Sequence, residues 1–212
     1  MKFKTVIFDL DGTLIDSYAA IQESLNYVLE HFGQPKVDLA ATKKMVGRGL
    51  ENLMIQAVGE DRKEEAIALF RKSYDETVMR GTFLLPEVGE TIRDLYEEGI
   101  KMAVASNKPS IYSRTILESF GLNPYFEACY GPDVVKQTKP HPAMLEGLMK
   151  ELNADRKQTL YVGDMVIDVE TARNAGVPVA LIATGGNSSD ELRSLNPDYF
   201  LDSFASLRLI IE

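Results

Sequence analysis

The chain of 212 residues is predicted to be an α/β protein with a doubly wound, Rossmann-like parallel sheet and an inserted all-helical segment. Short apolar, β-rich runs alternate with amphipathic helical patterns along most of the sequence. Three of these helical patterns are followed directly by glycine, the usual left-handed helix terminator. One long stretch near the start contains helical patterns only, and this break in the alternation predicts the insertion.

Four apolar runs are predicted to be strands, at residues 5–8 (TVIF), 101–105 (KMAVA), 159–162 (TLYV) and 178–182 (PVALI). Continuous apolar runs of this length are typical of strands buried on both faces, as in a parallel sheet. Helical patterns lie between them, at residues 87–98, 109–120, 142–152 and 166–175. Strands that alternate with helices in this way indicate right-handed βαβ units.

Residues 17–80 contain three helical patterns and no β-rich run. We expect this part of the chain to form a separate small domain, or cap, over residues 17–83. Residues 1–16 and 84–212 would then form the α/β core domain. The hinges between the two are expected near Asp16–Ser17 and Thr82–Pro86.

Composition excludes several classes of protein. The formal net charge is −9 and hydrophobic residues make up 45% of the chain, so a nucleic-acid-binding face, a polybasic membrane anchor and a disordered chain are not expected. No apolar run reaches the ~18 residues that span a bilayer. Cys129 is the one cysteine, so an intrachain disulfide is impossible and a reducing compartment fits. We expect a cytoplasmic protein without nucleic-acid or membrane partners, and its oligomeric state is not predicted.

Polar residues follow three of the predicted strands. In open α/β sheets, reactive groups lie beyond the carboxyl ends of the strands. We therefore expect the polar groups that follow the strands, together with the lysine of a Lys-Pro-His-Pro turn, to converge at one edge of the sheet. They are Asp9, Asp11, Ser106, Asn107, Lys139, Asp164 and Asp168.

The four carboxylates of this set predict a metal site. Two like charges 4 Å apart repel by about 4 kcal/mol at an effective dielectric constant near 20, so such a cluster either protonates or recruits a cation. Hard carboxylate oxygens favour Mg²⁺, which retains water and commonly binds a phosphate as well. Asp164 and Asp168 share a face if a helix begins there, and Asp9 and Asp11 share one side of an extended segment.

A carboxylate next to such a metal is also a candidate nucleophile. Asp9, at the end of its strand, is placed for in-line attack on a phosphoryl group. Asp11 is a candidate to protonate the leaving oxygen and later to deprotonate the attacking water. Ser106, Asn107 and Lys139 would supply hydrogen-bond donors and one positive charge to the phosphoryl oxygens.

These motifs together resemble the haloacid dehalogenase-like superfamily. The segment DLDGTLIDS at residues 9–17 matches its first motif, Ser106-Asn107 the second, Lys139-Pro140 the third and GDMVID at residues 163–168 the fourth. The resemblance implies a nucleophilic Asp9 and an acid/base Asp11. It also implies Mg²⁺ held by Asp9, Asp164 and the backbone carbonyl of Asp11, with Asp168 in support, and phosphate held by Ser106 and Lys139. The inserted helices resemble the C1-type cap of phosphoglycolate phosphatase-like members.

Two positions of the sequence distinguish between the reactions that different branches of the family catalyse. Asp11 is present, whereas the dehalogenase and phosphonate-hydrolysing branches lack this second aspartate. Ile21 stands where phosphomutase relatives, such as those similar to β-phosphoglucomutase, have a histidine. The sequence therefore predicts an Mg²⁺-dependent phosphatase acting on a small phosphorylated metabolite, with a sugar phosphomutase and a non-catalytic protein of this fold as alternatives. Arg48, between two glycines, is either a substrate ligand or an exposed loop residue.

Overall fold

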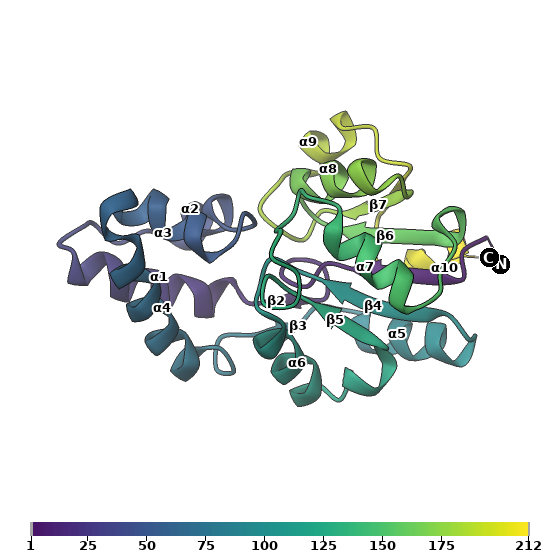
Figure 1. The fold of residues 1–212 in the computed structure, drawn as a ribbon, viewed down its shortest axis with the longest axis horizontal. Coiled ribbons are helices and arrows are strands. Elements are labelled where there is room, and N and C mark those ends of the chain that lie inside the picture. The colour runs from purple at the N-terminus through teal and green to yellow at the C-terminus, as the bar shows by residue number, and fades with distance from the viewer. Residues whose placement is uncertain (1, 212) are drawn as a thin grey trace.

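The computed structural model describes residues 2–211 and contains a six-stranded sheet in which every pair of neighbouring strands is parallel (Figure 1). The strands are β1 (Thr5–Phe8), β4 (Lys101–Ala105), β5 (Ala128–Tyr130), β6 (Thr159–Gly163), β7 (Val179–Ile182) and β8 (Tyr199–Leu201). Their order is β5-β4-β1-β6-β7-β8, so β1 lies between β4 and β6. Strand order reverses at β1, which confirms the predicted doubly wound α/β class.

Helices cover both faces of this sheet because successive side chains of a strand point to opposite faces. Val6 and Phe8 pack in one apolar cluster and Ile7 in another. The first cluster includes side chains of α5 (Val88–Glu97), α6 (Ser110–Ser119) and α10 (Leu207–Ile211). The second includes side chains of α7 (Ala143–Glu151), α8 (Val166–Ala175) and α9 (Ser189–Ser194). The result is a three-layer core with the sheet in the middle.

The four predicted strands are all present, within one residue of the expected bounds. The predictions omitted β5 and β8, which have three residues each and lie at the two edges of the sheet. Runs as short as ACY and YFL do not show a periodicity that separates a strand from a loop. Single 3₁₀ turns complete the secondary structure at Glu60–Arg62, Asn123–Tyr125, Arg156–Gln158 and Phe204–Ser206.

Four helices lie between residues 18 and 77 and extend away from the sheet on the left of Figure 1. They are α1 (Tyr18–His31), α2 (Leu39–Met45), α3 (Leu50–Val58) and α4 (Lys63–Thr77), and we call them the helical segment. The Gly47–Gly49 turn separates α2 from α3, and both glycines have positive φ angles, of 118° and 86°. Two short antiparallel strands, β2 (Ile15–Asp16) and β3 (Phe83–Leu84), connect the helical segment to the core. That this segment is a separate domain with hinges at these strands stays a prediction.

Lys2 and Ile211, the first and last residues that the structure describes, lie together (Figure 1). The backbone amide of Lys2 donates a hydrogen bond of 2.8 Å to the carbonyl of Ile211. Within residues 2–211, every helix is too short or too polar to cross a membrane.

Candidate active site

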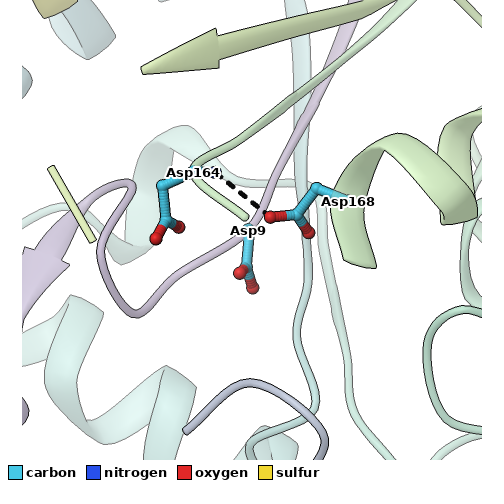
Figure 2. Close-up of side chains that lie close together, drawn as sticks. All are labelled: Asp9, Asp164 and Asp168. Carbon is cyan, nitrogen blue, oxygen red and sulfur yellow. Dashed lines mark hydrogen bonds between the residues drawn. The ribbon is translucent and has the colours of Figure 1, made fainter. Parts of the chain in front are cut away.

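Three aspartates meet at the carboxyl ends of β1 and β6. Asp9 follows β1 directly, Asp164 follows β6, and Asp168 lies in the first turn of α8. One carboxylate oxygen from each lies within 4.8 Å of the others, and the three side chains are buried (Figure 2). The sheet edge on which sequence reasoning placed these residues therefore brings them together.

Lys139 is the counter-ion of this cluster. Its Nζ lies 2.9 Å from Oδ1 of Asp9 and 2.8 Å from Oδ1 of Asp168, and it donates a hydrogen bond of 3.0 Å to the Tyr161 hydroxyl. Burial opposes a charge on this ammonium, but the carboxylates of Asp168 and Asp9 outweigh burial and raise the pKa of Lys139 above its usual value. A buried positive charge therefore stands beside the candidate nucleophile.

Both oxygens of Asp168 are already occupied by protein donors. Oδ1 accepts from Lys139 and, at 2.9 Å, from the Tyr161 hydroxyl. Oδ2 accepts from the backbone amides of Asp164 at 3.1 Å and Met165 at 3.0 Å, the first of which is drawn in Figure 2. Asp168 thus fixes the turn that carries Asp164 and holds Lys139 in place.

Asp9 and Asp164, in contrast, each present a carboxylate oxygen that makes no hydrogen bond within residues 2–211. Oδ1 of Asp9 makes the ion pair with Lys139 but no hydrogen bond, and Oδ2 of Asp164 has no hydrogen-bond partner. Burial raises the pKa of Asp9 to about 6 in spite of the neighbouring Lys139, and it raises the pKa of Asp164 well above its usual range. Buried acceptors without partners are costly, and an all-oxygen donor set is the kind that Mg²⁺ prefers. The residues therefore fit a divalent cation.

Two glycines make room around the free oxygen of Asp164. A Cβ atom on Gly185 would lie 1.7 Å from Oδ2 of Asp164, and a Cβ on Gly12 would lie 2.3 Å from it. Gly12 also has a φ of 89°, which side chains rarely adopt. Side chains at either position would displace the carboxylate that is left unpaired.

We expect Gly185→Ala to weaken Mg²⁺ binding by about tenfold or more, because the new methyl group forces Asp164 out of place. Titration of the rise in melting temperature with Mg²⁺ measures this. Gly89→Ala is the matched control, since its Cβ would meet only the tip of Leu84 at 3.3 Å. Equal Mg²⁺ affinity in the two variants would contradict a metal site at Asp164.

Asp11 lies on the side of the site that faces the helical segment. Its Oδ1 accepts hydrogen bonds from the Ser17 hydroxyl and, at 2.8 Å, from Nζ of Lys108. The Lys108 ammonium also donates to the Tyr74 hydroxyl of α4, at 2.7 Å. Sequence reasoning missed Lys108, although its position directly after Asn107 was an available signal. This buried lysine links the candidate acid/base to the helical segment.

Ser106 and Asn107, at the end of β4, are both buried. The Ser106 hydroxyl accepts from the backbone amide of Lys108 at 3.3 Å. The Asn107 side chain donates to the carbonyls of Gly47 at 2.9 Å and Lys139 at 3.2 Å, and accepts from the Lys139 amide at 2.8 Å. Asn107 therefore positions the Lys139 turn and contacts the helical segment.

Three further residues lie at the site and were not predicted from the sequence. Thr13 donates a hydrogen bond of 2.7 Å to Oδ1 of Asp164, and its place in the DGT turn could have suggested it. Tyr18 is buried, and its hydroxyl, which has no hydrogen-bond partner among the described residues, is close to where a Cβ on Gly12 or Gly185 would stand. Tyr161 sits inside an apolar strand, where its sequence context indicates only a core residue.

A cavity opens between the core and the helical segment, with Asp9, Asp11, Asn107 and Lys139 on the core side. The opposite wall is mostly apolar, and it is formed by Ile21, Val46, Leu50, Leu53, Phe70 and Tyr74. Arg48 is exposed and is not one of the lining residues, whereas its neighbours Gly47 and Gly49 are. The structure thus brings together the four predicted aspartates, Asn107 and Lys139, whereas Arg48 is exposed and Ser106 is buried but does not line the cavity.

Known proteins resemble this chain over most of its length. The model of the haloacid dehalogenase-like hydrolase family matches residues 6–182. A phosphoglycolate phosphatase of Yersinia pestis is 33% identical over 98% of this chain and 94% of its own length. One from Rhodospirillum rubrum is 36% identical over 96% of this chain and 89% of its own length.

Solved structures agree with the sequence relatives. The crystal structure of a predicted phosphoglycolate phosphatase from Haemophilus somnus superposes with a TM-score of 0.93 at 30% identity. That comparison covers 100% of this chain and 99% of the other. A putative haloacid dehalogenase-like hydrolase from Bacteroides fragilis gives a TM-score of 0.92 at 26% identity, over 97% of this chain and all of the other. With the family model matching most of its length and relatives this similar across nearly all of it, the chain belongs to the haloacid dehalogenase-like hydrolase family.

Proposed function

We propose that the protein hydrolyses a small phosphate monoester with Mg²⁺ bound, through an aspartyl-phosphate formed on Asp9. Its place among hydrolases of phosphoric monoesters rests on the family and on relatives named phosphoglycolate phosphatase. The observation that carries the proposal is the buried, incompletely satisfied carboxylate of Asp9, which lies beside Asp164 and Lys139 and lines the cavity. The names of the relatives make phosphoglycolate the first substrate to test.

The side chains divide the reaction between them. Asp9 attacks phosphorus and forms the new P–O bond as the bond to the ester oxygen breaks. Asp11 donates a proton to the leaving oxygen and then removes one from the water that hydrolyses the acyl phosphate. Lys139 and the backbone and hydroxyl groups around Ser106 stabilise the negative charge on the phosphoryl oxygens. Lys139 also keeps Asp9 oriented through the contact of 2.9 Å.

Asp9, Asp164 and the backbone carbonyl of Asp11 would hold the metal, and Asp168 would support it through the Asp164 turn. When bound, Mg²⁺ would neutralise charge on the phosphoryl oxygens and on the carboxylates around it. The test is turnover of an aryl phosphate with EDTA and with Mg²⁺ restored. Activity that persists in EDTA would contradict the metal requirement.

Stability is expected to depend on both pH and Mg²⁺. The pKa of Asp9 rises from 3.8 to about 6 on folding because the carboxyl is buried, so the folded protein binds this proton more tightly than the unfolded chain does. The stabilising effect is complete below pH 3.8 and is lost as pH rises through about 6. For the metal-free protein, this group therefore lowers the melting temperature between about pH 5 and pH 7.5.

Mg²⁺ binds the ionised carboxylates, so it should raise the melting temperature more at about pH 7.5 than at about pH 5. Scans in EDTA and in millimolar Mg²⁺ at both pH values measure the difference. An Mg²⁺-induced rise that is equal at the two pH values, or absent at both, would contradict the carboxylate site.

A sugar phosphomutase is not favoured. Ile21 lines the cavity at the position where the related mutases have a histidine, and its side chain cannot transfer a proton. The mutase alternative would require isomerisation of a hexose phosphate to exceed its hydrolysis, and a coupled assay with both readouts decides this.

A further inference from the structure

The wall opposite Asp9 indicates which leaving groups the site accepts. Leu53 and Phe70 are 5% and 6% exposed, and they line the cavity together with Leu50 and Val46. These side chains come from α3, α4 and the loop before α3, all within the helical segment. A substrate with its phosphorus against Asp9 has its leaving group against this wall.

Few polar groups on the walls are free to bind a substrate hydroxyl. The Asn107 amide uses both N–H groups and its oxygen on backbone partners. Lys108 uses two of its three N–H groups on Asp11 and Tyr74, and the Tyr112 hydroxyl donates to Asp75 at 2.5 Å. Among the cavity-lining residues of the helical segment that the structure describes, Arg71 alone is charged, and it is exposed.

A hydroxyl-rich leaving group would thus lose water and gain few partners, which disfavours its binding. An apolar leaving group instead gains by removing leucine and phenylalanine surface from water. We propose, resting on the phosphatase function above, that the site selects phosphate monoesters with a compact apolar leaving group. Leu50, Leu53 and Phe70 are then its specificity-determining residues. Phosphoglycolate, whose leaving group carries a carboxylate, is then expected to be a poorer substrate than propyl phosphate.

A matched pair of substrates tests this. Propyl phosphate and glycerol 1-phosphate have the same carbon skeleton, and they differ by two hydroxyl groups. The hydroxyls make the glycerol alkoxide the better leaving group, so chemistry alone favours glycerol phosphate. We expect kcat/KM for propyl phosphate to be larger by about tenfold or more, as differential binding of this kind provides.

A matched pair of variants tests whether the apolar cavity wall causes the preference for propyl phosphate. Leu50→Ser places a hydroxyl on the wall and should lower the propyl-to-glycerol ratio of kcat/KM by about threefold or more. Ile55→Ser makes a similar change in the same helix, at a partly buried position that does not line the cavity, and should leave the ratio unchanged. The ratio is independent of the fraction of folded enzyme, so loss of stability in either variant does not affect the comparison.

Hydrolysis of 4-nitrophenyl phosphate separates failure of this inference from failure of the proposed function. A wild-type ratio at or below one, or turnover of neither alkyl ester while the aryl ester is hydrolysed, overturns the preference and leaves the phosphatase intact. Equal ratios in the two serine variants overturn the role of Leu50. No hydrolysis of the aryl ester overturns the phosphatase function and this inference with it.

Discussion

The Asp9→Asn variant is expected to lose at least about a thousandfold in kcat on an aryl phosphate, because the amide cannot attack phosphorus. The substitution keeps the shape of the side chain. Lys139 keeps its contact with Asp168 at 2.8 Å, so the buried ammonium still has a carboxylate partner in the variant. Steady-state kinetics with saturating Mg²⁺ measure the loss, and far-ultraviolet circular dichroism with a melting scan verifies the fold.

Asp16→Asn is the matched control, with the same change of group in the same motif. Asp16 accepts a hydrogen bond from the Tyr18 amide at 3.1 Å, which an asparagine oxygen can also accept, and it does not line the cavity. Its kcat should stay within a few-fold of the wild type. Turnover by folded Asp9→Asn at a wild-type rate would refute Asp9 as the nucleophile.

Lys139→Met is expected to destabilise the protein by about 3–5 kcal/mol, because it removes one partner of a buried charge cluster. The Lys139 side chain is 1% exposed, and its loss leaves Asp9 without a counter-ion and Asp168 without one of its donors. Urea unfolding at neutral pH measures the loss, and activity should fall as well because the phosphoryl oxygens lose a positive charge.

Two further variants test whether the lost stability comes from removal of the buried positive charge. Lys150→Met alters an exposed lysine of α7 and should change stability by no more than about 0.5 kcal/mol. Adding Asp168→Asn to Lys139→Met removes one uncompensated carboxylate and should recover part of the lost stability. A Lys139→Met protein as stable as the Lys150→Met control would show that the buried ion pairs contribute nothing to folding.

The sequence predicted the parts of the fold that have strong periodicity. Residues 101–105 form a strand with the bounds expected, because a buried parallel strand is apolar throughout. The edge strands β5 and β8 were missed because three residues carry too little pattern, and sheet pairing decides their conformation. Placement of Asp9 and Asp164 followed from topology, since the carboxyl ends of neighbouring parallel strands lie side by side.

Contacts across the cavity could not be predicted in the same way. Lys108 meets Tyr74 through a contact between residues 34 positions apart, and neither residue shows in the sequence that the other is near. For Arg48, the sequence suggests a contact that the structure does not contain. Two flanking glycines allow its loop to approach the core, and the structure leaves its side chain exposed while the glycines line the cavity. Backbone freedom is visible in a sequence, but the direction of a side chain is set by packing.

The short ribbon of β2 and β3 places the two ends of a long excursion next to each other, with Asp16 paired to Phe83. A tight turn could join these two positions without shifting any strand of the main sheet. We therefore expect that the helical segment can be shortened or replaced without moving Asp9 and Asp164, which follow strands of the main sheet. Asp11 is the exception, because the Lys108 ammonium that contacts it is held by Tyr74 of the helical segment.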